Sequence, residues 1–129
     1  MANLVGSYKL VSSENFGEFL KEIGVSMVTR KLAENSKPTV EIKQEGDEYI
    51  IKTIAFKNSE IRFKLGQEFE EKRLDGNTVK TVVNLVDGKL VQKQFGDKEV
   101  TITREVEGDT LKVVCQSGDV VSTRIYKRE

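Results

Sequence analysis

Two arginines and a tyrosine in the C-terminal part of this sequence are the residues best suited to hold an anion. Across residues 100–106, apolar residues occupy the even positions except at Arg104, and polar residues occupy the odd positions. Alternate residues of a β-strand share a face, so Arg104 is expected to point inward. Across residues 120–127, Arg124 and Tyr126 are two apart and also share a face.

An inward arginine needs an anion nearby, because a guanidinium group stays charged in proteins. A bound ligand could supply that anion, and so could an inward glutamate of the same chain. Arg104 could also extend its aliphatic stem to water at a strand end, and Arg124 could lie on the surface of a terminal strand. The alternation alone leaves these structural roles open beside a ligand site.

The surrounding sequence predicts a sheet that could enclose these side chains. Residues 4–12 alternate as a first strand, and from Thr39 onward short alternating runs are separated by turn sequences such as Asp87-Gly88 and Gly118-Asp119. Glycine accepts the positive φ of such turns without steric cost. About nine runs follow the first strand, which gives ten strands in total. An up-and-down barrel would remove the exposed edges of such a sheet, and a two-sheet sandwich is the alternative.

Residues 15–35 interrupt the strands with a helical pattern. Apolar residues recur on one helical face at Phe16, Phe19, Leu20 and Ile23. Asn15 is the expected N-cap of this helix, and Ser26 is the expected N-cap of a second one. The second helix carries Met27, Val28 and Leu32. Helices this short are marginal alone, so both are expected to need an apolar surface to pack on.

The expected interior contains polar groups among its apolar ones. The inward set includes Thr53, Thr81 and Ser122 in addition to the two arginines and the tyrosine. Cys115 shares a face with Leu111 and Val113 and is also expected to point inward. Buried polar atoms need partners, which a cavity holding water and a ligand can supply. The sequence therefore favours a ligand cavity over a filled core, although some of these residues could lie at barrel ends.

Composition restricts the classes of function. The chain has 129 residues, 37% hydrophobic and 33% charged, which suits one soluble globular domain. Lysine plus arginine equals aspartate plus glutamate at 21 each, which argues against a general nucleic-acid binder. Histidine is absent and Cys115 is the single cysteine. These counts remove histidine-based hydrolytic catalysis, an internal disulfide and a conventional zinc site. We therefore expect no catalytic residue, no metal and no cofactor.

Two further absences favour a cytoplasmic location. The N-terminus lacks the basic start and apolar centre of a secretory signal, and no apolar run reaches the length of a membrane span. One cysteine in 129 residues also fits a reducing compartment.

Several stretches resemble the intracellular lipid-binding proteins, and within them the fatty-acid-binding protein group. They are GSYKLVSSENFGEFLKEIGV near the N-terminus, KPTVEI and FKNSEIRFKLGQEFEE in the centre, and TITREVEGDTLKVV and STRIYKRE at the end. The resemblance spans residues 1–129 as a single domain. Two positions depart from it: Gly17, where the family usually has an acidic residue, and Tyr8, where many members have tryptophan.

The resemblance implies an all-β fold, a ten-stranded antiparallel β-clam related to the lipocalins, with the two helices as a lid. It also implies a monomeric cytosolic carrier of a long-chain fatty acid rather than an enzyme. The Arg…Arg-x-Tyr set that meets the carboxylate in the family falls on Arg104, Arg124 and Tyr126. Family positions around the lid and opening fall on Phe16, Leu20, Val25, Met27, Thr29 and Phe56. Of these, Phe56 is expected to gate entry.

Two alternatives remain within this resemblance. Retinol-type members usually replace an interior arginine with glutamine, so the two arginines favour an acid as the ligand. Retinoic acid is also an acid, so it or another hydrophobic carboxylate could be the ligand. A role at a membrane surface is the other alternative, with transient contact between anionic lipids and basic residues of the lid and opening. These basic residues are Lys21, Arg30, Lys31 and Lys57, and they are diluted by Glu14, Glu18, Glu22 and Glu34.

Overall fold

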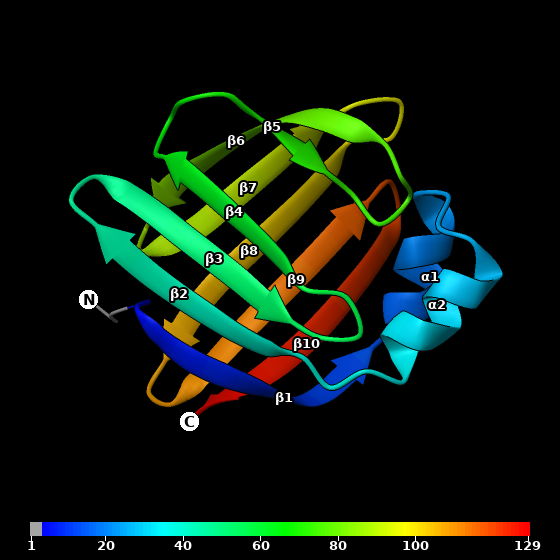
Figure 1. The fold of residues 1–129 in the computed structure, drawn as a ribbon, viewed down its shortest axis with the longest axis horizontal. Coiled ribbons are helices and arrows are strands. Elements are labelled where there is room, and N and C mark those ends of the chain that lie inside the picture. The colour runs from blue at the N-terminus through cyan, green and yellow to red at the C-terminus, as the bar shows by residue number, and fades with distance from the viewer. Residues whose placement is uncertain (1–3) are drawn as a thin grey trace.

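A computed structural model describes residues 4–129 and contains ten strands and two helices (Figure 1). The first strand, β1 (Gly6–Glu14), leads into α1 (Phe16–Glu22) and α2 (Met27–Glu34). Nine strands follow: β2 (Thr39–Glu45), β3 (Glu48–Ile54), β4 (Ser59–Lys64), β5 (Phe69–Lys72), β6 (Thr78–Val86), β7 (Lys89–Phe95), β8 (Val100–Glu107), β9 (Thr110–Ser117) and β10 (Val120–Arg128). The predicted number of strands and the position of the helices after the first strand are confirmed.

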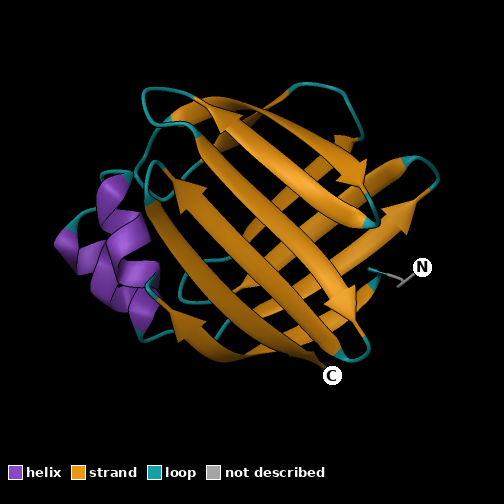
Figure 2. Ribbon diagram, turned by 180° about the vertical axis from the view of Figure 1, so that it is seen from behind, coloured by secondary structure: helices purple, strands orange, loops and turns teal. Residues whose placement is uncertain are grey.

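The strands form one antiparallel sheet that curls into a nearly closed barrel (Figures 1 and 2). The order is β4-β3-β2-β1-β10-β9-β8-β7-β6-β5. Consecutive strands therefore pair with each other except β4 and β5, and the first and last strands, β1 and β10, also pair. Rings span this gap: Phe63 on β4 stacks on Phe69 of β5 with 5.7 Å between ring centroids. A single sheet with this order is the predicted barrel and excludes the two-sheet sandwich.

The predicted turns lie between consecutive strands. At the β6–β7 turn, Asp87 and Gly88 both have positive φ values, 52° and 80°, which suits the Asp-Gly sequence. The first strand begins and ends two residues later than the predicted 4–12. Its register against β10 shifts between Leu10 and Ser12, which is the signature of a β-bulge.

The two helices cover one end of the barrel (Figures 1 and 2). Ser26 caps α2 as predicted, since its hydroxyl accepts a hydrogen bond from the Thr29 amide at 3.3 Å. Asn15 occupies the N-cap position of α1 as predicted, but its side chain makes no capping hydrogen bond. Its side-chain amide instead donates to the Val121 carbonyl at 2.9 Å and ties the start of α1 to β10.

The helices differ in what they bury. In α1, Phe19 and Leu20 are buried against the barrel, whereas Ala33 is the one buried residue of α2. The expectation that α2 packs its apolar side chains on the barrel is therefore wrong for Met27, Val28 and Leu32, which are all exposed. In the described part of the chain, neither helix is long and apolar enough to cross a membrane.

Candidate functional site: a cavity with a polar wall

A cavity of about 640 Å³ lies inside the barrel beside α1 and reaches the β3–β4 turn. Its wall is mostly apolar and includes Phe16, Leu20, Ile51, Ile61, Phe69 and Val113. Polar side chains gather on the part of the wall formed by β5, β7, β8 and β10. A space of this size and character suits a small apolar ligand that carries one polar end.

Arg124 and Tyr126 lie together on β10 and are only 4% and 5% exposed. Both line the cavity, because residues two apart on a strand share a face. Arg124 Nε donates to the Tyr126 hydroxyl at 3.4 Å, and its Nη1 donates to Ser13 Oγ at 3.3 Å. The Arg124 guanidinium also lies 3.8 Å from the centroid of the Phe16 ring.

Arg124 is thus buried with uncharged partners among the described residues. The Tyr126 hydroxyl accepts from Arg124, which leaves its own hydrogen free to donate to a third group. Burying a guanidinium is costly unless an anion and further hydrogen bonds compensate it. The Arg124–Tyr126 pair therefore has the chemistry of a receptor for a small anion, and a carboxylate matches its donors.

Arg104 on β8 has a different environment. Its Nη1 donates to the Gln92 side-chain oxygen, and Gln92 Nε2 donates to Glu71 Oε1 at 2.6 Å. Burial lowers the pKa of Arg104, while Cys115 and Glu71 oppose this effect. Glu71 therefore supplies a carboxylate for Arg104 through one intervening amide, which is the inward-glutamate arrangement that the sequence left open.

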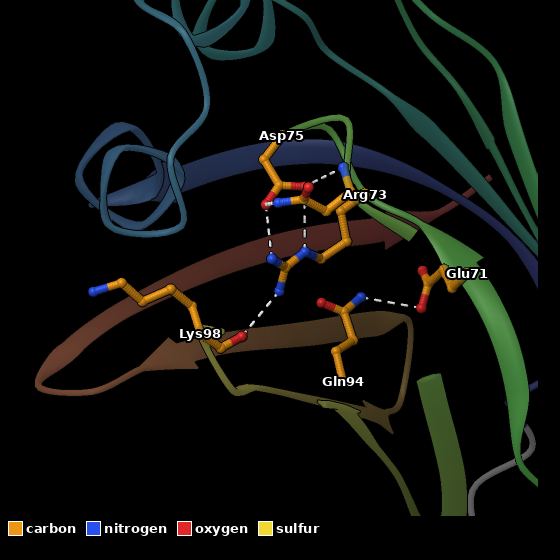
Figure 3. Close-up of polar contacts among 6 residues, drawn as sticks. Glu71, Arg73, Asp75, Gln94 and Lys98 are labelled. Atoms are coloured by element: carbon orange, nitrogen blue, oxygen red, sulfur yellow. Dashed lines mark hydrogen bonds and ion pairs between the residues drawn. The ribbon is translucent and has the colours of Figure 1, made fainter. Parts of the chain in front are cut away.

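Glu71 itself is held by three donors. Its Oε1 accepts from Gln92, from Gln94 Nε2 at 3.0 Å and from Thr81 Oγ1 at 3.1 Å. Figure 3 shows Gln94 reaching across to the Glu71 carboxylate. The three donors come from β6 and β7, so the network links adjacent strands along one wall of the cavity.

Cys115 lines the cavity beside these groups. Burial raises the pKa of its thiol to about 11, although Arg104 and Arg124 pull in the opposite direction. The thiol is therefore neutral at pH 7 and adds no charge to the cavity.

Phe16, Leu20, Thr53 and Phe56, which the sequence also indicated, line the cavity. Phe56 lies in the turn after β3 and is 42% exposed. The other three lid residues do not line the cavity, so their assignment to the ligand site stays a prediction. Val25 is buried in the core, Met27 is 60% exposed, and Thr29 bonds to Ser26 at the start of α2. Val25 precedes α2, and of α2 itself Ala33 is the residue that lines the cavity.

Sequence reasoning missed the part of the polar wall that faces Arg104. Glu71 shares a strand face with the half-buried Phe69, and Gln92 and Gln94 share a face with the buried Leu90. The alternation of β7 would have found Gln92 and Gln94, whereas β5 is too short and polar to reveal Glu71. Ser122, expected to point inward, is buried but donates to the Glu14 carbonyl at 2.9 Å rather than lining the cavity.

Comparison with known proteins identifies the family. Residues 5–129 match the lipocalin / cytosolic fatty-acid binding protein family. The chain belongs to this family. A fatty acid-binding protein of the mite Tyrophagus putrescentiae is 55% identical over 131 residues, covering 100% of both chains.

Solved structures of this family have the same fold. A fatty acid-binding protein from brain tissue of Drosophila melanogaster is 48% identical with a TM-score of 0.93, covering 97% of this chain and 99% of the other. A Schistosoma mansoni fatty acid binding protein, solved with arachidonic acid, is 40% identical with a TM-score of 0.96, covering 100% and 98%.

Proposed function

We propose that this protein is a non-catalytic cytosolic carrier, acting as a monomer, that holds a long-chain fatty acid in its cavity for transport and buffering. The observation that carries the proposal is Arg124, a buried cation whose described partners are all uncharged, at the wall of an apolar cavity. A fatty acid supplies the two things that this arrangement lacks, namely an anion and an apolar chain.

In the proposed complex, Arg124 donates to the ligand carboxylate and Tyr126 adds its hydroxyl hydrogen. Charge-assisted bonds of this kind are stronger than neutral ones, and the guanidinium fork matches a carboxylate. Arg104 is already bonded to Gln92, so its contribution is expected to reach the carboxylate through water. The apolar wall then takes the hydrocarbon chain, at up to about 0.8 kcal/mol per buried methylene.

The names of the relatives support a fatty acid as the ligand. The mite and fly proteins are both called fatty acid-binding proteins, and the Schistosoma mansoni protein was solved with arachidonic acid. Retinoic acid and other hydrophobic carboxylates carry the same head group, so they remain the alternative ligands of the same site.

The lid offers a second role beside carriage. Met27, Val28 and Leu32 form an exposed apolar surface on α2, and Arg30 and Lys31 lie on the same short helix. Apolar side chains beside cations suit a transient contact with an anionic membrane, where the ligand could be collected or delivered.

Isothermal titration with hexadecanoic acid and hexadecanol tests the proposal, because the two ligands share a chain and differ in head charge. The acid should bind more tightly than the alcohol, and shortening the chain should weaken it by at most roughly fourfold per methylene. Retinoic acid in the same assay separates the alternative ligand, and mass spectrometry of lipid extracted from the purified protein identifies what it carries. Equal affinity for acid and alcohol would contradict the proposed head-group site.

A further inference from the structure

Three charged side chains lie within the polar wall: Arg104, Arg124 and Glu71. The other charged residues that border the cavity are Lys57, Glu60, Arg62, Glu70, Lys72 and Arg73. All of these except Arg73 are exposed, so water and salt screen them. Arg73 is buried but forms an ion pair with Asp75 at 2.7 Å. The polar wall thus carries two positive charges and one negative charge.

Hydrogen-bond donors enclose the Glu71 carboxylate. Three donors converge on one of its oxygens, and each stabilises negative charge there. The donor residues Thr81, Gln92 and Gln94 are all buried, so the arrangement is held by packing as well as by hydrogen bonds. Arg104 completes the network from the other side of Gln92.

We infer that Glu71 sets the charge selectivity of the cavity, so that it accepts a singly charged head group and discriminates against a doubly charged one. Glu71 offsets one of the two arginines, and one net positive charge remains for the ligand. This inference rests on the proposed function, since it concerns the same head-group site. It assigns to Glu71 a role in specificity, through the electrostatic potential of the wall rather than through contact with the carboxylate.

The physical basis is the cost of an uncompensated charge inside a protein. A monoanion beside Arg124 brings the polar wall to neutrality, whereas a dianion leaves one negative charge without a partner. Charges in a partly enclosed site interact more strongly than in water, so this excess is costly. A carboxylate or sulfate head group would therefore be accepted, and a phosphate monoester would be disfavoured in its doubly charged form.

Two alkyl ligands isolate this effect because they share a chain and a tetrahedral head group. Dodecyl sulfate carries one negative charge, and dodecyl phosphate carries close to two at a pH of about 8. Below their critical micelle concentrations, isothermal titration gives the ratio of their dissociation constants for each variant. The parent protein should bind the sulfate more tightly than the phosphate.

Glu71→Gln removes one negative charge while keeping a side-chain oxygen that can accept from the same donors. The dissociation constant of the phosphate should then fall by on the order of tenfold relative to that of the sulfate. Glu107→Gln is the matched control, because it removes one negative charge from an exposed position on β8. This control should leave the ratio unchanged.

Arg104→Gln provides an independent variant in case Glu71→Gln does not fold. It removes one positive charge from the same network. The dissociation constant of the phosphate should therefore rise further relative to that of the sulfate. Circular dichroism establishes that each variant is folded.

The outcomes separate this inference from the proposed function. If hexadecanoic acid binds but neither variant changes the sulfate-to-phosphate ratio, the selectivity role of Glu71 is overturned and the carrier function stands. If the parent binds neither hexadecanoic acid nor dodecyl sulfate, both the carrier function and the inference are overturned.

Discussion

The two sides of the cavity opening are built differently. On one side, which we call the fixed side, lie α1, the β5–β6 turn (residues 73–77) and the β7–β8 turn (residues 96–99). On the other, the loose side, lie α2 and the β3–β4 turn (residues 55–58). The fixed side is tied by buried side chains and charge pairs, and the loose side exposes its apolar ones.

Charged groups join the elements of the fixed side. The Arg73 guanidinium pairs with Asp75 within the β5–β6 turn and donates to the Lys98 carbonyl of the β7–β8 turn at 3.0 Å (Figure 3). The Lys98 ammonium lies 3.3 Å from Glu22 at the end of α1. One arginine and one lysine thus link two turns and a helix.

The loose side has little of this support. Met27, Val28 and Leu32 of α2 are at least half exposed, and Phe56 at the tip of the β3–β4 turn is 42% exposed. Segments with few buried contacts open at lower free-energy cost than the rest of a fold. We therefore expect the ligand to pass the loose side of the opening, while the fixed side keeps its shape.

The largest expected effect is on the fixed side, from Arg73→Met. Removing one partner of a buried ion pair leaves the other charge uncompensated, so the free energy of unfolding should fall by about 3 kcal/mol. Urea unfolding at pH 7 measures it. Arg62→Met is the matched control, since Arg62 is exposed among Glu45, Glu48 and Glu60, and it should change stability little.

The same pair predicts a pH dependence. Burial alone would raise the pKa of Asp75, but hydrogen bonds from Arg73 and Asn77 outweigh it and hold the pKa below its usual value of 3.8. The stabilisation from Asp75 is therefore complete above pH 3.8 and is lost as the pH falls through the lower folded value. A difference between parent and Arg73→Met that persists undiminished far below pH 3.8 would contradict this assignment.

Leucine substitutions test the contrast between the two helices. Leu20 on α1 is 2% exposed and Leu32 on α2 is 50% exposed. Leu20→Ala should lower the free energy of unfolding by about 2.5 kcal/mol, at the smaller end for a core leucine because the residue already borders a cavity. Leu32→Ala should change it by less than about 0.5 kcal/mol. Equal losses in urea unfolding would mean that both helices are anchored alike.

Phe56→Ala should speed ligand release severalfold while changing equilibrium affinity less, because we propose that Phe56 gates entry rather than binding the head group. Leu74→Ala is the control on the fixed side, since Leu74 lines the cavity in the β5–β6 turn and is similarly exposed. Stopped-flow displacement of a bound fluorescent fatty acid measures both. A larger acceleration in Leu74→Ala would place the route on the fixed side.

A smaller effect is expected at Cys115, which lines the cavity from β9. Its raised pKa of about 11 and its burial should make labelling by a small thiol reagent slow at pH 8. A bound fatty acid should slow labelling further by filling the cavity. Fast labelling at the same rate with and without a bound fatty acid would show that the reagent reaches the thiol from outside the barrel.

Strand alternation predicted the positions of Arg104, Arg124 and Tyr126 because a strand fixes the face of each residue. It could also have placed Glu71, but β5 is short and polar, with the sequence FEEK, and gives little periodic signal. The lid was predicted less well. Helical periodicity finds an apolar face but not what covers it, so Met27, Val28 and Leu32 were expected to pack and are exposed.

The resemblance to fatty-acid-binding proteins placed Val25, Met27 and Thr29 at the site, although none of them lines the cavity. A family position transfers the place of a residue in the fold, but its orientation depends on packing between α1, α2 and the barrel. That packing involves contacts between distant segments, which no local spacing in the sequence encodes.

Titration of Arg124→Gln tests most directly that Arg124 reads the charge of the ligand. Removing one partner of a buried charge pair costs about 2–5 kcal/mol. Isothermal titration of hexadecanoic acid and hexadecanol against parent and variant should show that loss for the acid and almost none for the alcohol. If the substitution weakens acid and alcohol equally, Arg124 has a structural role and the proposed carboxylate site is wrong.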